Sequence, residues 1–257
     1  MTSIEPHALV SSTLLLMVLL VFVLAGFVKG TIGLGLPTVT MALLALMMPP
    51  AEAAALLIAP SLVTNVWQIR PFVTVRPILR RLLPAQIGVF FGTLAGSWVL
   101  GAPAGAWAMV ALGGSLICYA VWGILGAQVS VRPTTERWLG PATGAITGLI
   151  TSATGVFVIP LVPYLQALEL PRDELIQAMG ISFTVSTISL AAGLYFNDHY
   201  SLTNLSESLL MVFPALGGMA IGQQLRQRLS PALFRKCFLV SLILLGVYMI
   251  VNELFLR

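Results

Sequence analysis

The stretch "AGFVKGTIGLGLPT", residues 25–38, places one lysine and several helix-breaking residues inside a long apolar run. The lysine is Lys29, and the breakers are Gly30, Gly33, Gly35 and Pro37. A simple membrane anchor excludes such residues, because a broken helix leaves backbone N–H and C=O groups without partners in lipid. A break of this kind persists where it is buried in protein or lines a wet cavity. The stretch therefore predicts a membrane protein whose first helix is broken at a functional position.

The composition of the whole chain agrees with a membrane location. Of its 257 residues, 58% are hydrophobic and 9% are charged, whereas ordinary soluble domains carry roughly 25% charged residues. The mean hydropathy is +0.98. A soluble core cannot hide this much apolar surface, so we predict an all-α, polytopic integral membrane protein. The N-terminal segment has no basic region and no small-residue cleavage site after its apolar run, so we expect a retained first span.

Apolar stretches along the chain predict where the helices lie. A full span needs about 20 residues, and most of the stretches approach this length: 9–29, 53–69, 82–100, 104–126, 176–196, 206–225 and 237–255. Three shorter stretches are predicted to be half-helices: 36–48, 139–150 and 155–167. We expect 9–29 with 36–48, and 139–150 with 155–167, to form two hairpins that enter the membrane and return.

The basic residues are unevenly distributed among the loops. Of the 13 Lys and Arg residues, 11 lie in the loops 70–81, 127–138, 168–175 and 226–236. The loops 101–105 and 197–207 hold neither Lys nor Arg. The positive-inside rule then places the basic loops in the cytoplasm and both termini outside. This distribution predicts a multi-pass membrane protein.

The sequence also contains an internal repeat. "GFVKG" (26–30) matches "GAITG" (144–148), and "PAQIGVFFG" (84–92) matches "PALGGMAIG" (214–222). Pro50 and Ser61 correspond to Pro171 and Ser182 at one shared offset. These matches in the same order predict a duplication.

The two copies are predicted to be inverted, because each has an odd number of membrane crossings. We assign residues 1–126 to the first repeat, 127–138 to a cytoplasmic linker and 139–257 to the second repeat. Each repeat is expected to hold one broken helical hairpin and three transmembrane helices. Inverted repeats with discontinuous helices are typical of secondary transporters, which bind substrate near the midplane between the copies.

The two breaks are the predicted binding site. Half-helix N-termini offer unpaired N–H groups and a positive dipole end to an anion, and Lys29 adds a full positive charge. Along one face of 53–69 lie the polar residues Ser61, Thr64, Asn65 and Gln68. The candidate substrate-binding residues are Lys29, Gly30, Thr31, Gly33, Gly35, Thr38, Asn65, Thr151, Ser152, Thr154, Gly155 and Ser182.

Structural roles compete with this interpretation. Lys29 could extend its ammonium to water near an interface, and small polar residues commonly form hydrogen bonds between membrane helices. The glycines of the two proline-led motifs are more simply explained as helix-packing contacts: Gly88, Gly92, Gly218 and Gly222.

Several function classes have no candidate residues. Cys118 and Cys237 lie in apolar segments, and His7 and His199 are far apart, so we expect no metal site, no catalytic residue and no cofactor. All nine carboxylates fall in loops or at span ends, which argues against a membrane enzyme and against a proton relay of Asp or Glu. Glu52 is the one acidic residue that we keep as a relay candidate. The basic loops lack interleaved aromatic residues, so nucleic acid is not an expected partner.

At this point the chain resembles the sulfite exporter TauE/SafE family, also called the toluene-sulfonate uptake permease family. The similarity covers nearly the whole length and rests on "GFVKGTIGLGLP", "GAITGLITSATGVFVIP" and the helices with the Pro-x3-Gly-x3-Gly motif. The resemblance implies transport of sulfite, sulfoacetate or other organosulfonates across a bacterial inner membrane, with export as the expected direction.

Some alternatives stay open from the sequence. They are a carrier for a non-sulfur anion such as a carboxylate, and an anion channel. The expected partners are a small anionic substrate, the lipid bilayer and a coupling ion, either a proton or sodium. The sequence leaves a homo-oligomer open.

Overall fold

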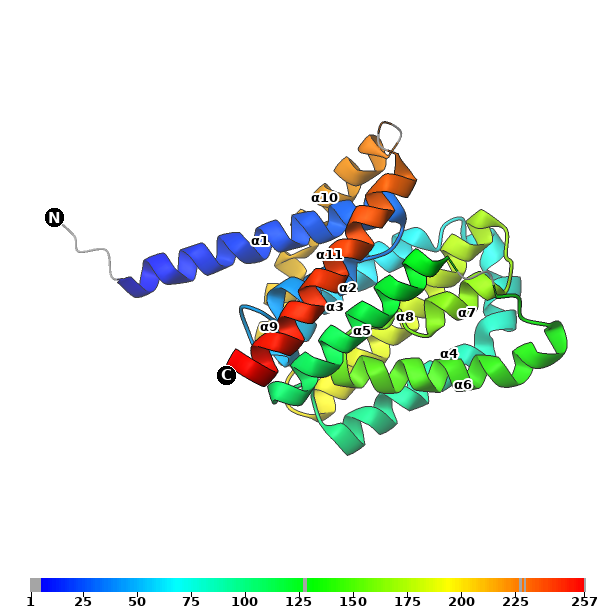
Figure 1. Cartoon of the computed structure of the whole chain (residues 1–257), viewed down its shortest axis with the longest axis horizontal. Helices are drawn as coiled ribbons and strands as arrows, with labels where there is room; N and C mark the ends of the chain where they lie inside the picture. Colours follow the sequence, from blue (N-terminus) through cyan, green and yellow to red (C-terminus); the bar gives the residue numbers. More distant parts are fainter. Residues whose placement is uncertain (1–5, 127–128, 227, 229, 257) are drawn as a thin grey trace.

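The computed structural model describes residues 6–126, 129–226, 228 and 230–256, and within these residues all regular structure is helical (Figure 1). The α-helices are α1 (Pro6–Ile32), α2 (Leu36–Leu44), α3 (Pro50–Gln68), α4 (Val75–Leu100), α5 (Gly105–Leu125), α6 (Pro133–Thr154), α7 (Leu161–Ala167), α8 (Arg172–Phe196), α9 (Leu202–Leu210), α10 (Val212–Leu225) and α11 (Pro231–Val251). A short 3-10 helix (Phe72–Thr74) precedes α4, and a π-helical turn (Asn252–Leu256) follows α11. The predicted all-α class is confirmed.

Among the described residues, six helical segments are long and apolar enough to cross a membrane. They are Thr13–Ile32, Phe72–Leu100, Gly105–Leu125, Arg172–Phe196, Asn204–Leu225 and Ala232–Phe255. Large apolar side chains such as Trp98, Phe213 and Leu244 are exposed on the outside of the bundle. So much exposed apolar surface is unfavourable in water and suits contact with lipid. The chain is a multi-pass membrane protein.

The connections between helices gather at two ends of the bundle (Figure 1). One end, which we call the basic end, holds the connections α3–α4, α5–α6, α7–α8 and α10–α11. The opposite end holds the connections α2–α3, α4–α5 and α8–α9, together with the end of α11. The arginines and the lysine of the predicted basic loops therefore lie at one end of the described structure.

The predicted half-helix at 139–150 is wrong. These residues belong to α6, which has 22 residues and begins at Pro133, inside the predicted linker. Proline suits the first turn of a helix, and the polar residues that follow it, such as Glu136 and Arg137, are not recognised by a search for apolar stretches. The predicted half-helix at 155–167 shortens to α7, with seven residues, after a non-helical connection over 155–160.

The first hairpin agrees better with its prediction. α1 has 27 residues, and α2, with nine residues, confirms the half-helix expected within 36–48. Pro37 lies in the first turn of α2, as predicted. Each hairpin therefore joins one long helix to one short helix through a break.

The predicted single span 206–225 consists of two helices, α9 and α10, which meet at Met211. Pro214 explains the break, because proline has no N–H with which to bond the carbonyl of Leu210. The two helices together still form one apolar crossing, Asn204–Leu225.

The long helix of each hairpin packs closely on a helix from the other half of the sequence. α1 lies on α10, and a Cβ atom on Gly26 would stand 2.1 Å from the carbonyl oxygen of Ala215. α6 lies on α4, and a Cβ atom on Gly144 would stand 2.1 Å from the carbonyl oxygen of Ala85. Small residues let membrane helices approach to backbone contact.

The glycines of α4 and α10 take part in the same contacts. A Cβ atom on Gly88 would lie 2.3 Å from the carbonyl oxygen of Pro141, and one on Gly218 would lie 2.0 Å from that of Val23. Gly92 and Gly222 are equally close to backbone atoms. The predicted packing role of these glycines is confirmed.

Candidate anion-binding site

Lys29 is buried in the last turns of α1, with 4% of its surface exposed. Its Nζ donates to Thr64 Oγ1 at 3.1 Å and to Asn65 Oδ1. Both acceptors lie in the last turns of α3, close to the basic end of the bundle. The lysine therefore points into the protein, toward α3, rather than outward to a surface.

A chain of hydrogen bonds continues from these acceptors to α8. Asn65 Nδ2 donates to Ser61 Oγ at 3.1 Å, and Ser61 Oγ is 3.0 Å from Thr187 Oγ1. Thr64 Oγ1 donates to the carbonyl oxygen of Pro60 at 2.7 Å, so it can only accept from the lysine. We call Lys29, Ser61, Thr64, Asn65 and Thr187 the Lys29 cluster. It joins α1, α3 and α8 in the buried centre of the protein.

The charge of an ammonium at Lys29 has no counter-charge in this cluster. Both of its hydrogen-bond partners are neutral, and the ion pair between Arg81 and Glu136 lies apart from it, at the basic end. A buried charge without a counter-charge is unfavourable, because it has lost its hydration. An anion bound next to this buried cation would supply the counter-charge that its neutral partners lack.

The first break lies beside this cluster. Gly33 and Gly35 have φ angles of 85° and 111°, a left-handed conformation that favours glycine. Gln68 Nε2, one turn after Thr64 on α3, donates to the carbonyl oxygen of Gly33 at 3.1 Å. On α2, the hydroxyl of Thr38 is buried and has no hydrogen-bond partner among the described residues. The first break therefore offers an unpaired hydroxyl next to the N-terminus of a half-helix.

The second break is closed by its own side chains. Thr154 Oγ1 accepts from the backbone N–H of Val156 at 3.1 Å and donates to the carbonyl oxygen of Ile150 at 2.7 Å. The hydroxyls of Thr151 and Ser152 likewise donate to carbonyl oxygens of α6, at 2.7 and 2.8 Å. Gly155 takes the left-handed conformation with a φ of 69°.

The two breaks lie toward opposite ends of the bundle. Lys29 meets the last turns of α3, which ends at the basic end. Ser152 lies against Gly96, in the last turns of α4, which ends at the opposite end. The structure thus brings Lys29 and Asn65 together, whereas Thr151, Ser152 and Thr154 form hydrogen bonds within the second break, and Gly155 lies against the side chain of Met41 on α2.

The remaining candidates have mainly structural contacts. A Cβ atom on Gly30 would lie 2.2 Å from the carbonyl oxygen of Met219, so this glycine is part of the contact with α10. Thr31 Oγ1 donates to the carbonyl oxygen of Phe27 at 2.9 Å. Ser182 accepts a hydrogen bond of 2.8 Å from Gln86 Nε2, which links α8 to α4.

Gln86 and Ser208 form buried hydrogen bonds that the sequence pattern did not predict. Ser208 Oγ donates to the carbonyl oxygen of Leu56 at 2.8 Å and accepts from the N–H of Ala59 at 2.9 Å. Pro60 gives the physical reason, because it cannot donate to Leu56 and so leaves that carbonyl free. Pro60, which lies inside a predicted span, is the feature of the sequence that indicates a free carbonyl group in need of a partner.

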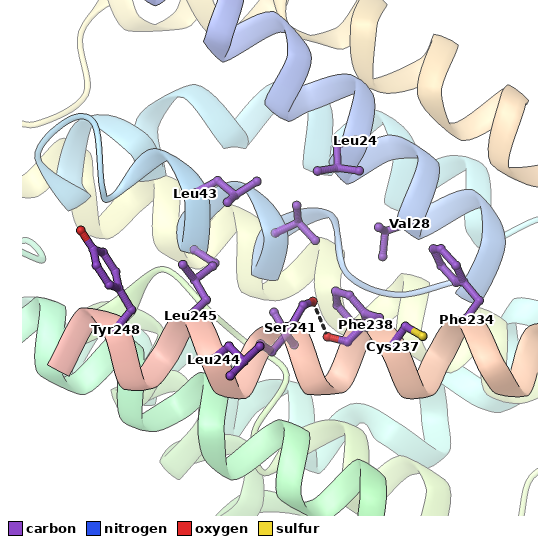
Figure 2. Close-up of a pocket in the computed structure, with 13 residues that line it drawn as sticks. Leu24, Val28, Leu43, Phe234, Cys237, Phe238, Ser241, Leu244, Leu245 and Tyr248 are labelled. Carbon is purple, nitrogen blue, oxygen red and sulfur yellow. Dashed lines mark hydrogen bonds between the residues drawn. The ribbon is translucent and has the colours of Figure 1, made fainter. Parts of the chain in front are cut away.

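Two cavities of the described structure are not lined by residues of the Lys29 cluster. A groove of about 670 Å³ lies between α1, α2 and α11, and Figure 2 shows its apolar lining, including Leu24, Leu43 and Phe238. The hydroxyl of Ser241 in this groove donates to the carbonyl oxygen of Phe238 at 2.7 Å. A groove lined in this way suits hydrocarbon chains and does not suit an anion.

A second cavity, of about 480 Å³, is lined by Glu52 and Glu207 near the start of α3. Two carboxylates repel an anion, so this cavity is also a poor candidate. The polar Lys29 cluster locates the candidate site better than either cavity does.

Apolar spans, two broken hairpins and a buried cation beside one break are the features of membrane transporters with discontinuous helices. The chain belongs to the sulfite exporter TauE/SafE family, whose model matches residues 18–249. This match confirms the resemblance found in the sequence. Comparison with curated proteins and with solved structures finds no match. The protein is accordingly a membrane transporter of the sulfite-exporter type, embedded in the lipid bilayer.

Proposed function

We propose that this protein is a secondary transporter, and not an enzyme, that exports small sulfur-containing anions across the inner membrane. Sulfite, sulfoacetate and other organosulfonates are the proposed substrates, as the family suggests. The observation that carries the proposal is the buried Lys29, whose partners Thr64 and Asn65 are both neutral. An anion at this position would supply the missing counter-charge and gain a charged hydrogen bond.

The anion is proposed to bind between the Lys29 cluster and the first turn of α2. This turn contributes the positive end of a half-helix and the unpaired hydroxyl of Thr38. Asn65 and Gln68 position the lysine and the break from α3. The second break, with Thr151, Ser152, Thr154 and Gly155, is proposed to line the pathway.

Alternating access is proposed to arise from two inverted repeats, residues 1–126 and 139–257. The exchanged packing of α1 on α10 and of α6 on α4 supports this arrangement, and so do the breaks toward opposite ends. The basic end is proposed to face the cytoplasm. A cysteine in place of the exposed His199, in a variant without Cys118 and Cys237, should then react only with reagents added outside.

Ligand-dependent thermal stability tests the substrate class. Purified protein is heated with sulfite, thiosulfate, sulfoacetate, taurine or carboxylate analogues, because binding to the folded state raises the melting temperature. We expect the sulfur oxyanions to stabilise the protein and Lys29→Ala to weaken the effect. Stabilisation by carboxylates alone would show that the substrate is a non-sulfur anion.

Transport in proteoliposomes separates a carrier from a channel. A carrier gives saturable uptake and counterflow, in which unlabelled anion inside accelerates entry of labelled anion. Flux that neither saturates nor shows counterflow would identify an anion channel instead.

A further inference from the structure

The hydrogen bonds of Lys29 match the neutral form of its amine. A neutral amine has two N–H groups and one lone pair, whereas an ammonium has three N–H groups. In this structure Nζ has two acceptors among the described residues, Thr64 Oγ1 and Asn65 Oδ1. Asn65 Nδ2 donates to Ser61, which leaves its oxygen facing the lysine. Without an anion, the site therefore satisfies both N–H groups of an amine and leaves the third N–H of an ammonium without a partner.

The helices around Lys29 provide no buried acidic group to replace the anion, and on α8 the carboxylates Asp173 and Glu174 are exposed in the first turn. α2 has no titratable residue, and the carboxylate of α3, Glu52, is exposed at its far end. On α11 the titratable residues are exposed: Arg235, Lys236, Cys237 and Tyr248. α10 ends next to Arg226, which is half-buried one turn beyond Gly222. The charged groups nearest to Lys29 along α10 and α11 are thus cations, which disfavour a second positive charge.

We propose that Lys29 itself carries the coupling proton of transport, so that one proton moves with each anion. This inference rests on the proposed anion site and adds the identity of the coupling ion. When the anion binds, the amine takes a proton from water in the open cavity, and the resulting ammonium donates its third N–H to the anion. When the anion leaves on the other side, the ammonium returns that proton to water and becomes the neutral amine again.

The charge carried by each state follows from this cycle. The loaded site holds one ammonium and one monoanion, with no net charge, and the empty site holds a neutral amine. Transport of a monoanion is then electroneutral. Export is then driven by the accumulated anion and does not use the membrane potential, and an inward proton gradient opposes it because the proton leaves together with the anion.

Proton uptake on binding is the direct test. Full-length protein in weakly buffered detergent solution is mixed with methanesulfonate, a strong-acid anion whose own protonation does not change near neutral pH. We expect uptake of one proton per bound anion in the pH range where the empty site holds the amine. In that range the affinity should fall about tenfold per pH unit as the pH rises, because binding of the anion and of the proton are linked.

Two variants distinguish the uptake of a proton at Lys29 from the mere presence of a positive charge there. Lys29→Arg keeps a permanent cation, so it should bind methanesulfonate without proton uptake and with a flat pH dependence. In proteoliposomes this variant should move net charge, and an imposed membrane potential should change its rate. Lys236→Arg, at an exposed lysine of α11, is the matched control and should behave as the wild type does.

The outcomes distinguish this inference from the proposed function. Wild-type protein that binds the anion through Lys29 without taking up a proton would overturn the coupling role and leave the anion site intact. If Lys29→Ala bound the anion with wild-type affinity, both the coupling role of Lys29 and the proposed anion site would be overturned. Loss of coupling in Glu52→Gln would assign the proton to that carboxylate and overturn the inference. The wild-type measurement decides the question even if Lys29→Arg does not fold.

Discussion

The two broken hairpins share a plan and differ in chemistry. Each has a long helix, a break with a left-handed glycine and a short helix, and each long helix packs by glycines on the opposite half. The first hairpin carries Lys29, and at the matching place in "GAITG" the second carries Thr147. Thr147 Oγ1 donates to the carbonyl oxygen of Thr143 at 2.8 Å, within its own helix. The two hairpins therefore share their helices and glycine contacts, whereas the matched position is charged in the first hairpin and neutral in the second.

This difference is what we expect of a transporter in which two similar hairpins serve one anion. Glycine contacts and helix breaks determine whether the protein folds and moves, so both hairpins need them. A single anion needs one cation, and a second buried lysine would repel the first and increase the cost of insertion. We therefore expect substitutions in the scaffold to act alike in the two hairpins, and substitutions in the polar residues to act differently.

The largest expected difference is between Lys29→Ala and Thr147→Ala. Loss of the ammonium should weaken anion binding by about 1.5–3 kcal/mol, the range for a charged hydrogen bond. The N–H groups of α2 remain, so binding should fall rather than vanish. Thr147→Ala removes a hydroxyl that bonds its own helix and should leave the affinity nearly unchanged.

Calorimetric titration with sulfoacetate measures both variants, and correct insertion is checked by labelling at position 199. Equal losses in the two variants would contradict the division between a charged and a neutral hairpin.

The glycine contacts should give a comparable loss of stability in both hairpins. A Cβ atom on Gly26 or Gly144 would overlap a backbone carbonyl, so Gly26→Ala and Gly144→Ala should each lower the unfolding free energy by about 1–3 kcal/mol. Gly114 has no atom within 4 Å of the same position and is the matched control. Gly114→Ala should be neutral or slightly stabilising, because alanine favours a helix.

Unfolding in mixed detergent micelles compares the three variants. A loss confined to one of the two hairpins would argue against a repeated scaffold.

The sequence predicts the scaffold better than it predicts the cluster. Lys29, the breaks and the glycine motifs are recognisable because each violates the rules for a simple span in lipid. The hydrogen bond between Lys29 and Asn65 is not recognisable, although both residues are candidates, because they are 36 positions apart and their contact depends on the arrangement of α1 and α3 in the fold. The length of α6 was missed because its first turns are polar. Ser208 was missed because its partner, the carbonyl of Leu56, becomes free only through Pro60.

The polar groups that close the breaks should have smaller and unequal effects. Gln68→Leu removes the donor to the carbonyl oxygen of Gly33 from another helix, and Thr154→Val removes the acceptor of the Val156 N–H within the second hairpin. Each should cost about 1–2 kcal/mol of stability, because a buried backbone group loses its partner. Gln68→Leu should also lower anion affinity, because it loosens the break beside Lys29, whereas Thr154→Val should not. Paired unfolding and titration experiments test this, and reduced affinity in Thr154→Val alone would place the anion at the second break.

The smallest effect is expected at the ion pair that ties the second hairpin to α4. Arg81 Nε and Nη2 donate to the two carboxylate oxygens of Glu136, at 2.8 and 2.9 Å, and the arginine side chain is 41% exposed. Solvent screens such a pair, so Glu136→Gln should cost about 0.2–1 kcal/mol of stability at low salt. The loss should shrink as salt is added, because the Debye length becomes shorter. Arg81→Gln should cost about the same, and the double variant should lose no more than either single one, since the residues act as a pair. Unfolding measured at low and high salt tests the pair. Additive losses that do not respond to salt would show that the two side chains contribute through packing and not through their charges.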